Sequence, residues 1–126
     1  MRILLQRVRS ASVDIEAERV AEIGQGLLLL CGFGALDRED WPTKTRRAAD
    51  KMVNLRVFTN DQGKLDHSVI DLGANILAVP QFTLYGKSLK GRRPDFTDAL
   101  DPSVASTAFD GFRDALEHAL GKPVQA

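Results

Sequence analysis

A short stretch in the second half of the sequence places polar residues at the end of an apolar strand. Residues 75–79 are mostly apolar and are followed by Pro80, Gln81, Phe82 and Thr83. Functional sites are often built where a strand ends in a loop. Pro80 has no N–H group, so the backbone that follows it is released from simple strand pairing. The amides of Phe82 and Thr83 are therefore free to point at an oxygen of a bound ligand, as in an oxyanion hole.

The same stretch also fits a plain structural role. If it continues as an extended strand, Gln81 and Thr83 face solvent while Phe82 and Leu84 pack inward. Covalent catalysis by the Thr83 hydroxyl would need a neighbouring base, and the nearby sequence contains none. Backbone donors need no such base, so an oxyanion hole fits the composition better than a nucleophile. From the residues alone, the structural role and the oxyanion hole both stay open.

A basic loop with two glycines follows over residues 86–94. Its cationic side chains are Lys87, Lys90, Arg92 and Arg93. They fit a solvated hairpin. They equally fit an arm that contacts phosphate groups beside the candidate site, because phosphate contacts depend on local positive charge.

The composition narrows the classes of function. Seventeen basic and seventeen acidic residues cancel, so RNA binding must come from local clusters of charge. His67 and His118 have no second ligand at a metal-site spacing, which predicts no metal site. Cys31 is the only cysteine and lies in an apolar run typical of a core. Charge at Arg2 and Arg7 interrupts the first apolar stretch, so we expect no signal peptide, no membrane span and a cytoplasmic protein.

The elements that position these residues follow from sequence patterning. Apolar segments separated by glycines predict strands over residues 3–8, 11–15, 20–23, 27–31, 55–58 and 75–79. The run over residues 27–31 lacks polar alternation, which predicts a central strand.

Two amphipathic segments predict helices. Asp40 caps the first, which accepts Pro42 in its first turn, and Asp101 caps the second, whose first helical residue is Pro102. Gly121 ends the second helix. The sequence therefore predicts one α+β domain over residues 1–126, with a mainly antiparallel sheet covered by two helices on one side.

Five groups of motifs occur in order along the chain. They are Gln6-Arg7-Val8 with Ala11-Ser12-Val13, Ile23-Gly24-Gln25-Gly26-Leu27, Leu55-Arg56-Val57-Phe58 with Asp61 and Gly63-Lys64, Gln81-Phe82-Thr83-Leu84, and Gly91-Arg92-Arg93-Pro94-Asp95-Phe96. Together they resemble the D-aminoacyl-tRNA deacylases, long called D-tyrosyl-tRNA deacylases. The resemblance implies a homodimer of small, barrel-like α+β subunits that hydrolyses the ester between a D-amino acid and the terminal ribose of tRNA. This is translation quality control, without metal or organic cofactor, and no DNA or membrane partner is expected.

The resemblance also implies roles for particular residues. Gln81, Phe82 and Thr83 form the catalytic pocket floor, with the Phe82 and Thr83 amides as oxyanion donors and a ribose hydroxyl plus water supplying the proton chemistry. Arg7 is expected to buttress the site from the first strand. The other expected substrate-binding residues are Pro80, Leu84, Lys87, Arg92, Arg93, Pro94 and Phe96.

Two departures from the family pattern bear on selectivity. Pro80 stands where the family has serine, which resembles a related branch of tRNA deacylases with relaxed chirality. The family also continues to a Gly-Pro dipeptide with a cis bond that enters the partner's pocket and excludes L-amino acids. No proline in this sequence follows a glycine, so we expect weakened chiral selection. The alternatives are an inactive relative that binds a tRNA end or another small ligand, and a small hydrolase of other D-amino-acid or ester substrates.

Overall fold

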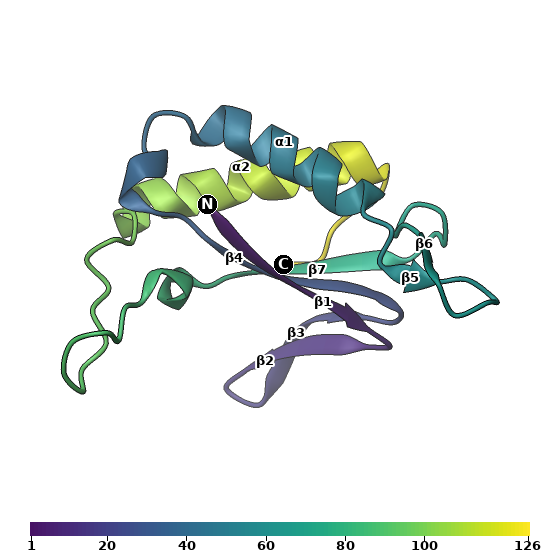
Figure 1. Cartoon of the computed structure of the whole chain (residues 1–126), viewed down its shortest axis with the longest axis horizontal. Coiled ribbons are helices and arrows are strands. Elements are labelled where there is room, and N and C mark those ends of the chain that lie inside the picture. Colours follow the sequence, from purple (N-terminus) through teal and green to yellow (C-terminus); the bar gives the residue numbers. More distant parts are fainter.

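A three-stranded sheet organises the molecule, which the computed structural model describes over residues 1–126 (Figure 1). The sheet contains β1 (Arg2–Val8), β4 (Gly26–Gly32) and β7 (Asn75–Pro80), with β4 in the middle. β1 and β4 are antiparallel along their whole length, with Arg2 opposite Gly32. The middle position of β4 confirms the prediction made from its apolar run.

β7 lies on the other side of β4 and runs parallel to it, with Cys31 opposite Pro80. A parallel neighbour requires a crossover connection. The chain makes this crossover through α1 (Trp41–Asn54) and the small strand pair β5 (Phe58–Thr59) and β6 (Leu65–His67). As a result, β4 and β7 both finish at the same end of the sheet. The other strand pairs are antiparallel, which confirms the mainly antiparallel prediction.

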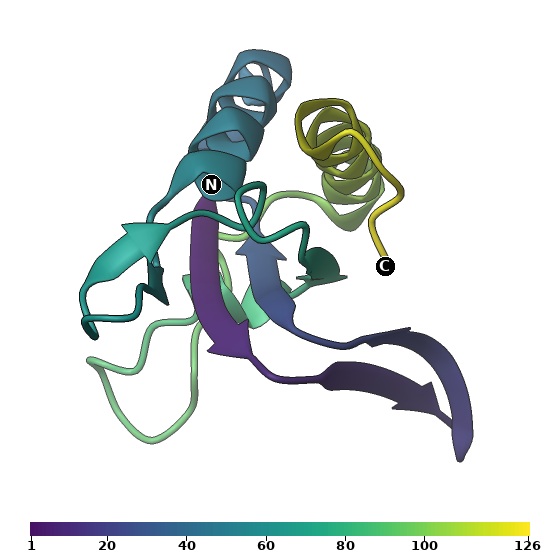
Figure 2. The ribbon, with the colours of Figure 1, turned by 90° about the vertical axis from the view of Figure 1, so that its right-hand side faces the viewer.

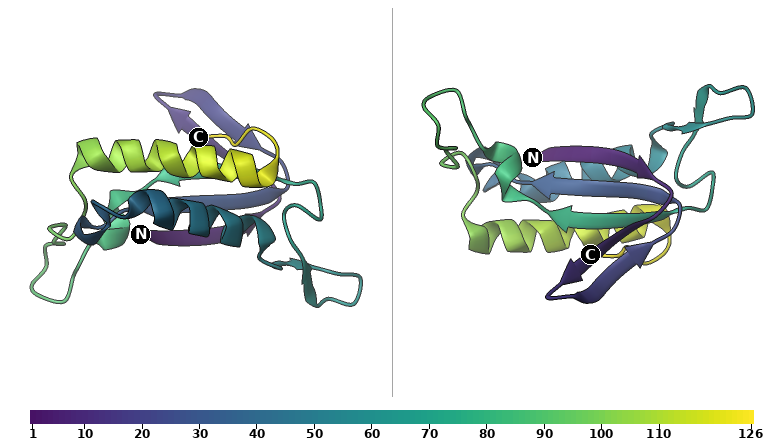
Figure 3. Two further views of the ribbon diagram at one scale, coloured as in Figure 1. Left: turned by 90° about the horizontal axis from the view of Figure 1, so that it is seen from above. Right: turned by 90° about the horizontal axis from the view of Figure 1, so that it is seen from below.

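The two long helices, α1 and α2 (Pro102–Leu120), lie side by side on one face of the sheet (Figures 2 and 3). Leu27 and Leu29 of β4 point toward the helices and are fully buried. They share one apolar core with Phe112 and Leu116 of α2. The predicted α+β arrangement, with two helices over one side of a sheet, is confirmed.

The ends of α2 follow their sequence signals. The Asp101 carboxylate accepts a hydrogen bond from the Ser103 N–H at 2.9 Å, and Pro102 is the first helical residue. Gly121 ends the helix with φ +79°, in the left-handed region that suits glycine. The cap predicted for α1 is only partly correct. Asp40 occupies the capping position, but its side chain accepts no cap hydrogen bond and instead lies 3.3 Å from Lys44 Nζ.

The strand predicted over residues 55–58 is much shorter in the structure. Leu55 is the residue that ends α1, and its backbone N–H donates to Lys51 O. Only Phe58 and Thr59 are left to pair with β6. Residues 55–57 form the connection from the end of α1 to β5, so most of the predicted strand is irregular backbone.

The strands of this chain form three sheets. The sheets are separate, and the largest has β1 and β7 at its edges. The remaining hairpin, β2 (Ala11–Ile15) with β3 (Glu18–Ile23), projects away from the helices (Figure 3). Gln125 attaches to the outer edge of β7, where Ala78 N–H donates to Gln125 O at 2.9 Å. The face of the sheet opposite the helices is covered only in part, where Ala21 and Ile23 of the hairpin pack on Leu77.

Candidate active site

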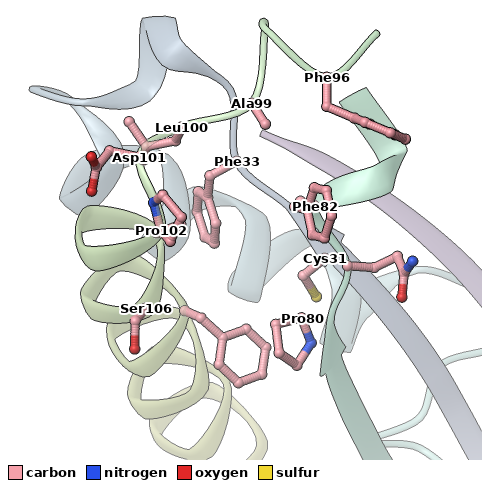
Figure 4. Close-up of a pocket in the computed structure, with 14 residues that line it drawn as sticks. Cys31, Phe33, Pro80, Phe82, Phe96, Ala99, Leu100, Asp101, Pro102 and Ser106 are labelled. Carbon is pink, nitrogen blue, oxygen red and sulfur yellow. The ribbon is translucent and has the colours of Figure 1, made fainter. Parts of the chain in front are cut away.

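A cavity of about 570 Å³ opens where β4 and β7 finish, between that end of the sheet and the first half of α2 (Figure 4). Its residues come from four segments: the end of β4, the end of β7 with the following turn, the segment before α2, and α2 itself. They are Cys31, Gly32, Phe33, Pro80, Gln81, Phe82, Phe96, Ala99, Leu100, Asp101, Pro102, Ala105, Ser106 and Phe109.

The inner wall of the cavity is apolar. Phe33 and Phe109 are both buried and line it together with Pro80. Figure 4 shows the Phe33 ring and Pro80 on this wall. Cys31 lies at the bottom, where burial raises the pKa of its thiol to about 12. A thiol with that pKa stays protonated at neutral pH, so Cys31 is not a nucleophile. This wall suits an apolar or aromatic part of a ligand.

Two aromatic rings stand at the mouth of the cavity. The Phe82 and Phe96 rings meet edge to face, with centroids 5.4 Å apart and planes at 70° (Figure 4). Phe96 folds back against the bare backbone of Gly86, where a Cβ atom would lie 2.7 Å from Phe96 Cε1. The Phe82 side chain keeps 59% of its surface exposed.

The turn after β7 supplies backbone donors beside this mouth. Gln81 N–H donates to Cys31 O at 2.7 Å, and a short 3-10 helix, η2 (Phe82–Tyr85), begins immediately after it. The amides of Phe82 and Thr83 precede the first hydrogen bond of that helix, which Leu84 N–H donates to Gln81 O at 3.3 Å. Neither amide therefore has an acceptor within the helix. Two such N–H groups beside an apolar cavity are able to bind a developing oxyanion.

The structure decides between the two interpretations of this stretch. The backbone turns into a helix at Phe82 and does not continue as an extended strand, so the alternation of inward and outward side chains does not apply. The interpretation that buries Phe82 is wrong, because its ring is mostly exposed. The Thr83 hydroxyl accepts a hydrogen bond from Gln81 Nε2, and no basic side chain contacts it.

The cavity contains no side chain suited to act as a general base. Asp101 and Ser106 are its other polar residues. Hydrogen bonds from the Ser103 hydroxyl and N–H lower the pKa of Asp101, and this carboxylate is already used as the cap of α2. Neither histidine lines the cavity. Proton transfer at this site would have to use water and groups of the substrate.

Of the residues predicted for the site, Pro80, Gln81, Phe82 and Phe96 line the cavity. Thr83 and Leu84 belong to η2 but do not line it. Arg7 does not line this cavity, and its expected buttressing role stays a prediction. It lies near the other end of β1, opposite Leu27, and its Nη1 donates to Val57 O at 2.8 Å.

The basic loop forms a hairpin that projects away from the sheet and the helices (Figure 1). Lys87 and Asp95 exchange both backbone hydrogen bonds at 2.8 Å, and Lys87 Nζ lies 2.5 Å from Asp98. Lys87 therefore closes the base of the hairpin. Four other residues of this hairpin are exposed: Lys90, Arg92, Arg93 and Pro94. The three cationic side chains among them form no ion pair.

Sequence reasoning missed the walls contributed by β4 and α2. Ala105 and Phe109 belong to the apolar stripe of α2, four residues apart, and that stripe predicts only core packing. The contribution of Phe33 depends on the parallel pairing of β4 with β7, which brings Cys31 next to Pro80. Only the cap at Asp101 gave a local signal that α2 begins near the site.

No three His, Cys, Asp or Glu side chains gather in a way that could hold a metal ion. Neither α1 nor α2 has the length and apolar character needed to cross a lipid bilayer.

Comparison with known proteins gives consistent matches. A family model described as D-Tyr-tRNA(Tyr) deacylase matches residues 4–126. A D-aminoacyl-tRNA deacylase from Exiguobacterium sp. is 47% identical over 116 residues, which are 92% of this chain and 77% of that protein. The protein of the same name from Chlorobaculum parvum is 42% identical over 125 residues, which are 99% of this chain and 82% of the relative.

Two solved structures are also similar. One, named c-Myc DNA Unwinding Element Binding Protein, has a TM-score of 0.84 and 36% identity, covering 94% of this chain and 77% of that one. The other is described as a probable eukaryotic D-amino acid tRNA deacylase and has a TM-score of 0.74 at 24% identity, covering 94% and 68%. At that identity the second match supports the fold alone.

Proposed function

We propose that this chain hydrolyses the ester joining a D-amino acid to the terminal ribose of tRNA, because it belongs to the D-aminoacyl-tRNA deacylase family. The observation that carries the proposal furthest is the pair of backbone amides at Phe82 and Thr83, which have no acceptor within η2 and stand beside an apolar cavity. Enzymes that cleave esters use such preorganised donors to stabilise the charge that develops on the carbonyl oxygen.

The proposed reaction needs no nucleophilic or basic side chain. Water attacks the ester carbon, and its oxygen forms the new bond to that carbon. The carbonyl oxygen becomes negative and accepts hydrogen bonds from the Phe82 and Thr83 amides. The bond between the carbon and the ribose oxygen then breaks. The proton lost by the water passes through the neighbouring ribose hydroxyl to the leaving ribose oxygen, which agrees with the absence of a free base in the cavity.

The cavity walls indicate how the substrate is held. The apolar wall at Phe33 and Phe109 is able to take the adenine of the tRNA end, because a base presents a flat apolar face to aromatic side chains. The exposed ring of Phe82 offers a second aromatic surface at the mouth. The ester would then lie next to the amides of η2.

The direct test is a deacylation assay with D-tyrosyl-tRNA and L-tyrosyl-tRNA at matched concentrations. We expect release of D-tyrosine well above the spontaneous rate, and comparable rates for the two substrates would agree with weakened chiral selection. If the protein binds aminoacyl-tRNA in calorimetry but accelerates neither reaction, it is the inactive, ligand-binding relative. Absence of both turnover and binding would overturn the two proposals together.

The basic hairpin provides a separate prediction. We propose that Arg92 and Arg93, which form no ion pair, contact tRNA phosphates. The double change Arg92→Ala and Arg93→Ala should raise KM by about 10-fold with little change in kcat. It should also reduce the slope of log Kd against log salt concentration by the amount expected for about two phosphate contacts. The control removes the same charge from α1 with Arg46→Ala and Arg47→Ala. An equal loss in both double variants would mean that only overall charge matters.

We also propose a homodimer, supported by the part of the sheet face opposite the helices that the β2–β3 hairpin leaves uncovered. Leu4 is 54% exposed on that face, and it lies opposite Leu30, which lies next to Val79. A second copy would cover this apolar surface. Leu30→Glu should convert a dimer into a monomer in sedimentation equilibrium, whereas Leu36→Glu, on the exposed 3-10 helix before α1, should not. A wild-type monomer at high concentration would contradict the proposal.

Several other expectations stay predictions. They are a cytoplasmic location, one domain over residues 1–126, no metal or organic cofactor, and no DNA partner. Adding a DNA duplex as competitor in the tRNA binding experiment tests the last of these directly. The duplex would displace tRNA only from a protein that also binds DNA.

A further inference from the structure

We infer that Arg2 and Tyr85 hold the η2 turn in the orientation that places the Phe82 and Thr83 amides at the cavity, and that they are positioning residues for the hydrolysis. Neither side chain lines the cavity, so they act through the turn. The catalytic consequence rests on the proposed function, whereas the structural link between Arg2 and the turn is measurable without it.

The η2 turn is too small to fix its own orientation. It contains four residues, and its first hydrogen bond, from Leu84 N–H to Gln81 O, is long at 3.3 Å. Short 3-10 helices have poor hydrogen-bond geometry and depend on their surroundings. The start of the turn is attached to β4 through Gln81 N–H and Cys31 O, at 2.7 Å. Its far end needs a separate attachment.

Arg2 provides that attachment from the beginning of β1. Its Nη1 donates to Leu84 O at 2.8 Å, and its guanidinium carbon lies 4.4 Å from the centroid of the Tyr85 ring. A planar guanidinium is able to donate from its edge while its face stacks on an aromatic ring. One side chain thereby ties the last two residues of η2 to the sheet.

Tyr85 completes the attachment because its ring packs directly on the backbone of Gly34. A Cβ atom at Gly34 would lie 2.5 Å from Tyr85 Cε1, and one at Gly32 would lie 2.8 Å from Gln81 O and 3.2 Å from Leu84 Cβ. The turn therefore sits directly on the segment that follows β4. Burial and the nearby negative charge of Asp37 raise the pKa of Tyr85, so its phenol is neutral when the ring stacks under Arg2.

The test compares Arg2→Ala, Arg2→Lys and Gly34→Ala with the wild type. Arg2→Ala should lower kcat by about 10- to 100-fold with KM changed less than about twofold, since a misplacement of about 1 Å can reduce a rate 100-fold. Arg2→Lys keeps a donor but loses the planar stack, so it should recover part of the rate. Gly34 has φ −101°, which alanine adopts, so Gly34→Ala displaces only the Tyr85 ring and should lower kcat in the same way.

The control is Arg9→Ala, which removes an exposed arginine with no ion pair just beyond β1. Amide resonances of Phe82 and Thr83 in ¹H–¹⁵N spectra should move in Arg2→Ala and stay fixed in Arg9→Ala, whether or not the protein turns over substrate. If the wild type lacks activity, the proposed function fails and these resonances alone decide the inference. Unmoved resonances in Arg2→Ala, or an equal loss of kcat in Arg9→Ala, would overturn it.

Discussion

Replacing Phe82 by proline should lower kcat about 10²- to 10³-fold below the rate of Phe82→Ala, the usual effect of removing one oxyanion donor. Both variants lose the ring, but only proline also loses the N–H group. Proline suits this place, because Phe82 is the first residue of η2 and Gln81 before it lies outside the helical region, at φ −145° and ψ 88°. The backbone is therefore expected to stay in place.

The measurement is single-turnover hydrolysis of D-tyrosyl-tRNA by the two variants, with tRNA binding measured in parallel. Phe82→Ala should itself change KM more than kcat, because it removes an aromatic surface at the mouth and leaves the donor. Equal rates for Phe82→Pro and Phe82→Ala would show that the Phe82 amide does not contact the reacting oxygen.

Asp37→Asn should lower the free energy of unfolding by about 3–5 kcal/mol, as expected when a buried ion pair loses one partner. Asp37 lies in the 3-10 helix η1 (Ala35–Asp37) and is 2% exposed. Its carboxylate accepts hydrogen bonds from the Met1 ammonium group, from Gly34 N–H at 2.8 Å and from Lys44 Nζ at 2.6 Å. Asparagine would leave the positive charge of Met1 without a counterion.

The pH dependence has a definite sign. Burial alone would raise the pKa of Asp37, but hydrogen bonds from Lys44, the Met1 ammonium and Gly34 outweigh it and lower the pKa from 3.8 to about 2. The charged form is thus favoured by folding, so its contribution of about 2 kcal/mol is complete above pH 4 and is lost as the pH falls through about 2.

Urea unfolding of the wild type and Asp37→Asn at pH 7 and at lower pH values checks both statements. The difference between the two proteins should shrink as the pH approaches 2. Asp14→Asn is the control, because Asp14 forms a solvent-exposed pair with Arg19 at 3.0 Å and should contribute no more than about 1 kcal/mol. A difference that stays constant down to pH 2 would contradict the assignment to the Asp37 carboxylate.

The sequence predicted the features whose cause is local. Asp101, Pro102 and Gly121 mark the ends of α2 because capping depends on neighbouring residues only. The unbroken apolar run in β4 predicted its central place, since a strand between two others is shielded along its length. Pro80 with the polar residues after it indicated the turn that carries the candidate donors.

The remaining features depend on contacts between distant residues. Nothing near Phe33 signals that β4, the strand before it, pairs in parallel with β7, and the cavity exists only because of that pairing. Phe109 occupies a helical stripe that serves core and cavity alike. The motif that contains Arg7 says nothing about which end of the sheet it occupies, and only the pairing of β1 with β4 places it opposite Leu27.

The parallel pairing of β4 with β7 also has a consequence for how the chain folds. β1 and β4 belong to the first part of the chain, so their pairing and that of β2 with β3 close short loops. β7 reaches β4 only after the whole crossover through α1 has been made, and closing such a long loop is slow. We therefore expect the cavity to be assembled last, after the N-terminal hairpin and the pairing of β1 with β4 have formed in refolding.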